Sequence, residues 1–227
     1  MAPTLVNVAV GVLLGIALLG PAFDRRSLTA VALAAAVPDL DAALSLLVPG
    51  ATNAALHSLF IPVVAAGLLY WDTELRARSA VRTRYGWDGV RVGWVVVAVY
   101  AVAGIGLDLF AGSVAVLYPL SDRYLAITGH FVLSTQDGVV QSYVQFGDGW
   151  LGLHSPGMTD SHHVATWINP TPGTDTPAGV ERRLRIVDAG WQAVIVLSAL
   201  AAIPARVLVG EDWSASGDDW SASEGER

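Results

Sequence analysis

The chain has 227 residues, of which 53% are hydrophobic and 15% are charged, and its mean hydropathy is +0.51. An average soluble domain is about 25% charged, so this composition argues against a water-soluble globule and favours a membrane protein. The 13 basic residues are all arginine and are outnumbered by 20 acidic residues. This balance excludes a nucleic-acid-binding protein, which would need a basic patch. Because there is no cysteine, a metal could bind only through His, Asp, Glu or water.

Five apolar segments predict a multi-pass bundle, because about 20 apolar residues suffice to span a membrane. They are residues 5–20, 28–48, 54–71, 92–111 and 189–208. No basic residue precedes the first segment, which favours a retained helix over a secretory signal. The second segment is interrupted by Pro38, Asp39, Leu40 and Asp41, and such an interruption needs a structural or functional reason.

The arginines between the segments predict the orientation in the cell membrane. Arg25, Arg26 and the arginine-rich stretch 72–91 occupy short loops, which the positive-inside rule assigns to the cytoplasm. The N-terminus is then expected outside, together with residues 112–181. Three arginines within 182–185 disagree with this rule, because they precede the last segment on the outer side.

The region outside the membrane shows strand signals. Apolar and β-branched runs at 131–133 and 139–146 flank a turn at 136–138, which predicts a hairpin. The acidic, Ser-rich tail contains the sequence DWSAS twice and cannot bury enough apolar surface to order itself.

These features predict a mainly α fold: a transmembrane helical bundle with a small β-rich extramembrane subdomain and a disordered acidic tail. The expected divisions are a membrane core at 1–121, a β-rich insertion at 122–185, a last transmembrane helix at 186–209 and the tail at 210–227.

Three aspartates, Asp39, Asp41 and Asp108, fall inside predicted spans. A charge at a span centre costs about 2.5–3.5 kcal/mol on insertion scales, so such residues mark function more often than surface charges do. His57 lies near the start of the third segment, and the predicted topology allows all four side chains to meet on the outer side. Carboxylates and an imidazole suit a divalent cation, with Zn²⁺, Mn²⁺ and Mg²⁺ all open. Such an ion activates water, and Asp39 or Asp41 is expected to take the proton in a hydrolysis.

Each of these residues also has a structural interpretation. Asp39 or Asp41 could cap the helix that follows the break. His57 could be a packed histidine, and Asp108 could pair with an arginine or line a watery cavity.

The outer region offers further nitrogen donors, namely His130, His154, His162 and His163. The adjacent pair at 162 and 163 would point to opposite faces of a strand, so at most one of the two should face a site. His154, His162 and His163 are held as reserve ligands, and His162 is included in the predicted metal set.

Several ordered motifs resemble a known family. They are VPDLD at 37–41, LHSL at 56–59, GLDLF at 106–110 and LYPLS at 117–121, which follow an apolar helix containing Gly11. Over residues 4–121 the chain resembles the LexA-binding, inner-membrane-associated hydrolases, also described as membrane-bound metal-dependent hydrolases. The resemblance implies that Asp39, Asp41, His57 and Asp108 belong to a metal site.

The chain also departs from the family pattern. Family members usually carry histidine where this chain has Asn7, Thr52 and Gly104. Three explanations for these missing histidines stay open. Histidines of the outer region substitute for them, the metal is a harder ion that prefers oxygen, or the chain has lost activity.

The first functional prediction is therefore a metal-dependent hydrolase acting on a lipid-linked or phosphate ester, with the bilayer as its surroundings. The alternative is an inactive membrane scaffold with the same fold. A transporter would require an internal repeat, and the sequence shows none. The sequence indicates no protein partner. Acidic segments outside the membrane, together with the absence of lysine, predict adaptation to high salt, as in a halophilic archaeon.

Overall fold

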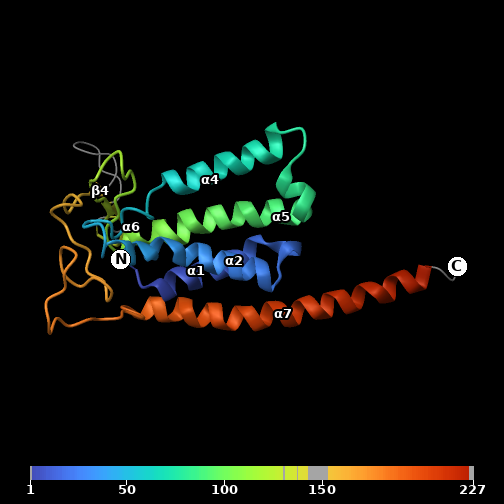
Figure 1. Cartoon of the computed structure of the whole chain (residues 1–227). Helices are drawn as coiled ribbons and strands as arrows, with labels where there is room; N and C mark the ends of the chain where they lie inside the picture. Colours follow the sequence, from blue (N-terminus) through green and yellow to red (C-terminus); the bar gives the residue numbers. More distant parts are fainter. Residues whose placement is uncertain (1, 130, 137, 143–152, 225–227) are drawn as a thin grey trace.

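The computed structural model describes residues 2–129, 131–136, 138–142 and 153–224. It is mainly helical, and the helices run side by side, with the loops and short strands gathered at the end where the N-terminus lies (Figure 1). Within the described part of the chain, three helices are long and apolar enough to cross a membrane: Arg25–Leu44, Ala80–Ala111 and Gly190–Leu208. The expectation of a mainly helical, membrane-associated protein is confirmed at this level.

Two of the five predicted spans form shorter helices. The helix α1 (Thr4–Leu18) has 15 residues and α4 (Phe60–Tyr70) has 11. The second of these begins six residues later than the apolar pattern at 54–71 suggests. The reason is that the preceding backbone bonds elsewhere: for example, the N–H of Leu59 donates to the carbonyl of Val116 over 2.9 Å. His57 therefore lies in a loop before α4 and not within a helix.

The second predicted span is a composite helix. It begins as α2 (Arg25–Ala36), where the side chain of Asp24 accepts a hydrogen bond from the N–H of Ser27. It then tightens into the 3₁₀ turn η2 (Val37–Leu40) and continues as α3 (Asp41–Leu44). Pro38 has no N–H to donate, and its ring crowds the preceding turn, which accounts for the change of winding. This change brings Asp39 and Asp41 into the protein interior.

The fourth predicted span, 92–111, is part of a longer composite helical segment that begins inside the predicted loop 72–91. The π-helical η3 (Trp71–Leu75) connects α4 to α5 (Ala80–Val99). The latter continues through the π-helical η4 (Tyr100–Gly106) into α6 (Leu107–Ala111). Irregular windings of this kind are frequent at functional sites, and here one immediately precedes Asp108.

Small side chains let α1, α2 and α5 approach closely. One buried cluster joins these helices through Leu19, Val31, Ala34, Ala35, Val95, Val99 and Ala103. A Cβ atom at Gly11 would lie 2.7 Å from the Cβ of Ala35, so only glycine fits at this crossing. Small residues at helix crossings are typical of packing inside membranes.

The described part of the region between α6 and α7 contains two small antiparallel sheets. In one, β1 (Ala126–Ile127) pairs with β4 (Leu153–His154). In the other, β2 (Phe131–Ser134) pairs with β3 (Gly138–Gln141), and Leu133 lies opposite Val139. A small sheet part is therefore present, with the expected hairpin. Asp137 of its predicted turn and residues 143–146 of the longer predicted strand lie outside the described residues.

The last helix is longer than the predicted span. The helix α7 (Gly190–Glu224) contacts α1 and extends well beyond the other helices (Figure 1). It continues through most of the tail at 210–227, so the predicted disorder of that tail is not confirmed. The predicted domain divisions stay predictions.

Candidate metal centre

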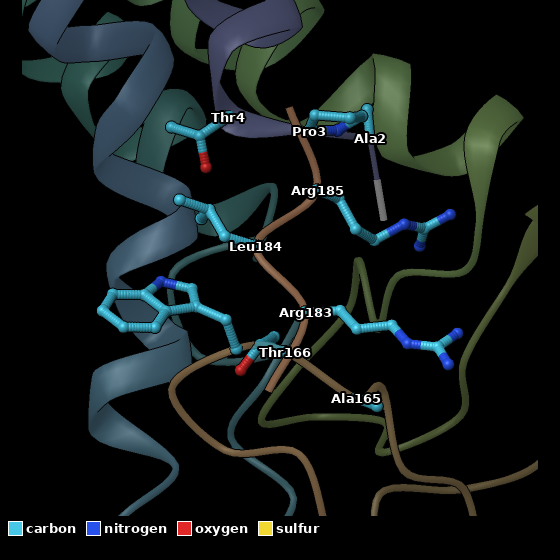
Figure 2. Close-up of a pocket in the computed structure, with 9 residues that line it drawn as sticks. Ala2, Pro3, Thr4, Ala165, Thr166, Arg183, Leu184 and Arg185 are labelled. Atoms are coloured by element: carbon cyan, nitrogen blue, oxygen red, sulfur yellow. The ribbon is translucent and has the colours of Figure 1, made fainter. Parts of the chain in front are cut away.

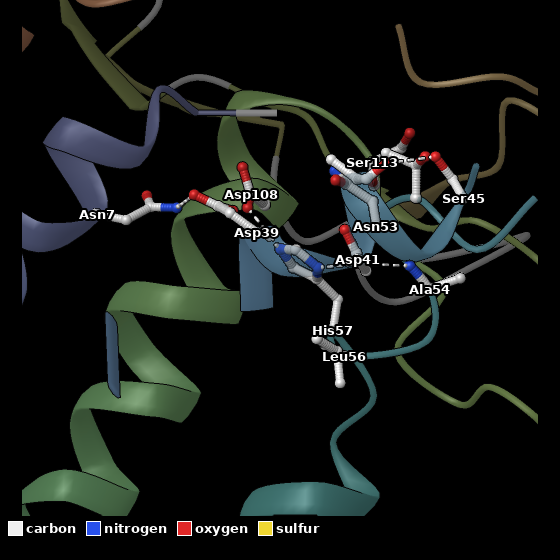
Figure 3. Close-up of polar contacts among 12 residues, drawn as sticks. Asn7, Asp39, Asp41, Ser45, Asn53, Ala54, Leu56, His57, Asp108 and Ser113 are labelled. Carbon is white, nitrogen blue, oxygen red and sulfur yellow. Dashed lines mark hydrogen bonds and ion pairs between the residues drawn. The ribbon is translucent and has the colours of Figure 1, made fainter. Parts of the chain in front are cut away.

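Four polar side chains from separate segments meet at the end of the bundle where the N-terminus lies (Figure 3). Asp39 comes from η2, Asp41 opens α3, His57 lies in the loop before α4, and Asp108 belongs to α6. All four are buried. Placing several ionisable groups in an apolar helical bundle is costly unless they are paired or bind an ion.

His57 is the centre of this cluster. Its Nδ1 lies 2.7 Å from Oδ2 of Asp41, and its Nε2 lies 2.9 Å from Oδ2 of Asp108. The same Nε2 is 3.6 Å from Oδ1 of Asp39. The ring is held from both edges, so the orientation of Nε2 is fixed.

Three of the four side chains could share one ion. A carboxylate oxygen of Asp39, a ring nitrogen of His57 and a carboxylate oxygen of Asp108 all lie within 4.8 Å of one another. Asp41 stands outside this group because it contacts the other ring nitrogen, which points the opposite way. A carboxylate in that position orients the ring of a histidine ligand and raises its basicity.

Buried oxygen atoms in this region lack hydrogen-bond partners among the described residues. They include Oδ1 of Asp39, Oδ1 of Asp41 and Oδ1 of Asn7. Buried polar atoms are nearly always bonded, so unsatisfied acceptors beside carboxylates indicate room for a cation or water. Nδ2 of Asn7 lies 3.5 Å from Oδ2 of Asp39, which places this amide at the site. Asn7 was not among the predicted ligands, although an amide inside an apolar helix is itself a signal of function.

The glycine at position 104 explains one departure from the family pattern. A Cβ atom there would lie 2.7 Å from Cγ of Pro38. A histidine therefore cannot occupy this position unless η2 moves. The close packing of Gly104 on Pro38 instead fixes the turn that carries Asp39.

The reserve histidines lie apart from this group. Nε2 of His162 is 3.2 Å from Oγ of Ser113, and its ring packs edge-on against Tyr124. His163 donates from Nε2 to the carbonyl of Asn169. Among the described residues, neither belongs to the group that could share an ion. His154 is the last residue of β4, and His130 lies outside the described residues.

The expectation that His162 and His163 face opposite ways assumed that they lie in a β-strand. The structure has a turn and irregular chain there, and both His162 and His163 line one pocket of about 350 Å³.

A small pocket lies beside the N-terminal residues of the chain, which contact the metal centre (Figure 2). Its volume is about 60 Å³, and Ala2, Pro3 and Thr4 form one wall. The N–H of Ala2 donates to Oδ1 of Asp108. The opposite wall is an extended stretch in which Arg183 and Arg185 point to one side and Leu184 to the other, as expected for alternating residues.

Comparisons with protein-family models, curated proteins and solved structures found no match for this chain. The function therefore has to be argued from the chemistry of the site. That chemistry is a buried group of carboxylates around one imidazole, at one end of a membrane-type helical bundle.

Proposed function

We propose that this chain is a membrane-bound metal-dependent hydrolase of the LexA-binding, inner-membrane-associated type. Asp39, His57 and Asp108 hold its divalent cation. One observation carries the proposal: ligand atoms from these three buried residues lie within 4.8 Å of one another. The unpartnered Oδ1 of Asp39 supports it further, because a bound cation would satisfy this atom.

The donor set favours a hard cation. Two carboxylates and one imidazole are present, so oxygen donors outnumber nitrogen donors, and the amide nitrogen of Asn7 faces Asp39 over 3.5 Å. Carboxylate, carbonyl and water ligands suit Mn²⁺ or Mg²⁺, whereas zinc sites commonly use more nitrogen or sulfur donors. A divalent charge would also offset the mutual repulsion of the buried carboxylates.

When bound, such an ion supplies Lewis-acid activation of water. The remaining roles fall to the side chains. Asp41 holds Nδ1 of His57 and thereby aims Nε2 toward Asp39 and Asp108. Because the cation would engage Oδ1 of Asp39, the remaining acceptor is Oδ1 of Asp41, which has no hydrogen-bond partner among the described residues and would take the proton from water.

The location of the site supports a lipid-linked or phosphate ester as substrate. Asp39 and Asp108 belong to two candidate membrane spans, Arg25–Leu44 and Ala80–Ala111. A substrate that reaches them has to approach along the bilayer or through its outer surface. A lipidic ester meets this requirement more readily than a fully water-soluble one.

An inactive scaffold is the second candidate, and the packing at Gly104 favours it. Pro38 occupies the space where the family resemblance implies a histidine, so one nitrogen donor is lost. A protein that kept this fold without the chemistry would bind no metal tightly.

Metal analysis of the purified full chain separates the two candidates. After loading with Mn²⁺ and dialysis, elemental analysis should find a stoichiometric amount in the wild type and none in a variant carrying Asp39→Ala and His57→Ala. Asp72→Asn is the matched control, since Asp72 is equally buried but lies outside this cluster. A wild-type protein that retains no more metal than the double variant would exclude the enzyme. Size-exclusion chromatography checks that each variant is folded.

A further inference from the structure

The end of the bundle opposite the metal centre contains a groove between α1 and α5. Its volume is about 760 Å³, and Leu18 and Pro21 line one side. Trp87, Arg91 and Trp94 of α5 line the other side. The turn between α1 and α2, which includes Pro21, lies at the end of the bundle far from the N-terminus (Figure 1).

Arg91 is the cationic group that lines this groove. Its Nη1 donates to the carbonyl of Leu19 over 3.4 Å, which is a long hydrogen bond. Gly20 has a φ of +53°, a conformation that favours glycine, and Nη1 of Arg91 lies beside it, 2.5 Å from where a Cβ atom would stand. Arg91 forms no ion pair with the described carboxylates, although Asp88 also lines the groove. Most of its hydrogen-bond donors therefore have no partner among the described residues.

The surroundings of Arg91 are positively charged. Arg206 of α7 donates to the carbonyl of Gly20 over 3.3 Å and packs on the ring of Phe23. Two more arginines, at 25 and 26, open α2 just after this turn. The nearby carboxylate of Asp24 is occupied by the cap of that helix. Even with Asp24 and with Asp88, which lines the groove, the four arginines leave a positive balance around it, and this balance suits an anion.

The remaining walls are apolar. Val95 and Ala98 continue along α5 away from Arg91 and face the groove together with Leu18. Trp87 and Trp94 are 65% and 39% exposed, and indole rings favour the boundary between lipid headgroups and acyl chains. A guanidinium at the headgroup boundary, followed by apolar walls, matches a molecule with an anionic head and an apolar tail.

We propose that this groove binds a phospholipid with an anionic headgroup. Its phosphate contacts Arg91, and an acyl chain lies along Leu18 and Val95. Guanidinium groups bind phosphate oxygens in pairs, and basic pockets between membrane helices bind acidic lipid headgroups. A soluble phosphate would leave the apolar walls unused, so the lipid is the occupant. This inference does not depend on the metal centre.

Native mass spectrometry of the full chain tests the proposal. The protein is incubated in detergent with equal amounts of phosphatidylglycerol and phosphatidylcholine. The wild type should retain phosphatidylglycerol preferentially, and Arg91→Gln should weaken this retention about five-fold, the factor for one arginine at an anionic lipid surface. Arg84→Gln is the control: it removes the same charge, but Arg84 precedes the kink at Gly86 and packs on Tyr85 outside the groove.

Three outcomes would overturn the proposal. An equal loss in Arg84→Gln and Arg91→Gln would indicate diffuse charge attraction and not a site. Displacement of the lipid by soluble glycerol phosphate would indicate a site for a free anion. Equal retention of both lipids by the wild type would show no headgroup recognition. A second variant, Ala98→Trp, fills the apolar wall and should reduce lipid retention even if Arg91→Gln does not fold.

Discussion

Asp39 and Asp72 are buried to the same extent, each with 8% of its surface exposed, but they lie at opposite ends of the bundle. Asp72 accepts hydrogen bonds from the hydroxyl of Ser79, from the N–H groups of Ala80 and Val81, and from Arg76. Asp39 has longer contacts, of 3.5 Å with Asn7 and 3.6 Å with His57, together with a side-chain hydrogen bond from Thr4. Burial alone therefore does not identify a functional carboxylate. The difference lies in whether its oxygens are satisfied within the fold.

The roles of the two aspartates follow from this difference. The hydrogen bond from Ser79, supported by the backbone of Ala80 and Val81, holds the pKa of Asp72 well below its usual range. That carboxylate holds the start of α5 against η3, and both of its oxygens already accept hydrogen bonds, so it is not available to bind a ligand. Asp39 keeps a free oxygen beside a second carboxylate and an imidazole, which is the condition for binding a cation.

The largest expected effect comes from removing a ligand. Asp39→Ala should lower Mn²⁺ affinity more than about 100-fold, because it removes a direct ligand, while loss of a supporting partner costs about 10–100-fold. The metal-free variant should not be destabilised, because the mutation relieves repulsion among buried carboxylates. Mn²⁺ titration and thermal unfolding in chelator measure the two effects. A clear loss of stability in chelator would instead show that Asp39 is a structural residue like Asp72.

The next effect concerns the orientation of His57. Asp41→Asn should weaken Mn²⁺ binding by about 10–100-fold, because Asp41 orients the ring without contacting the ion. Mn²⁺ titration of the purified variant measures this loss. If Asp41→Asn lost as much affinity as Asp39→Ala, Asp41 would be a ligand itself.

A packing change beside the site should act more weakly on the metal. Gly104→Ala forces Pro38 to move, because the added Cβ would lie 2.7 Å from Cγ of the proline. Overpacking of this kind costs about 1–3 kcal/mol of stability, and the displaced η2 should also reduce metal affinity. Gly67→Ala is the control, since a Cβ there meets no atom within 4 Å. Chemical denaturation in detergent measures the stability of the two variants. Equal stabilities of Gly104→Ala and Gly67→Ala would contradict the close packing at Gly104.

The smallest effect on Mn²⁺ affinity is expected from a mutation at the end of the bundle opposite the metal centre. Asp72→Asn should leave Mn²⁺ affinity unchanged but lower the thermal unfolding temperature at neutral pH. Because the pKa of Asp72 is lowered by folding, its contribution is complete above about pH 4 and is lost as the pH falls below that value. The difference between wild type and variant should therefore shrink on acidification. A difference that stayed constant with pH would contradict the ionised state of Asp72.

Sequence reasoning singled out the candidate carboxylates because charged residues are rare in such segments. Charged groups within apolar segments are costly, so Asp39, Asp41 and Asp108 stand out by their position in the sequence alone. The opposite roles of Asp39 and Asp72 could not be found this way. Both follow an apolar stretch, and only the contacts of Ser79 with one and of Asn7 with the other distinguish them.

Local pattern also failed where distant contacts decide the outcome. The apolar stretch 54–71 predicts a helix throughout, but its first six residues form a loop because their backbone binds segments far along the chain. The outer region predicts a β-rich subdomain, and its described part contains four short strands.

By itself, the sequence determined that the protein is membrane-associated and mainly helical, because hydropathy and segment length depend only on the order of residues. It also indicated which charges are exceptional. Only the tertiary structure decided that Asp41 faces Nδ1 of His57 while Asp39 and Asp108 face Nε2. It alone placed Arg91 against the turn at Gly20. The physical reason is that ligand geometry and hydrogen-bond satisfaction depend on distances between segments, and these distances are set by packing.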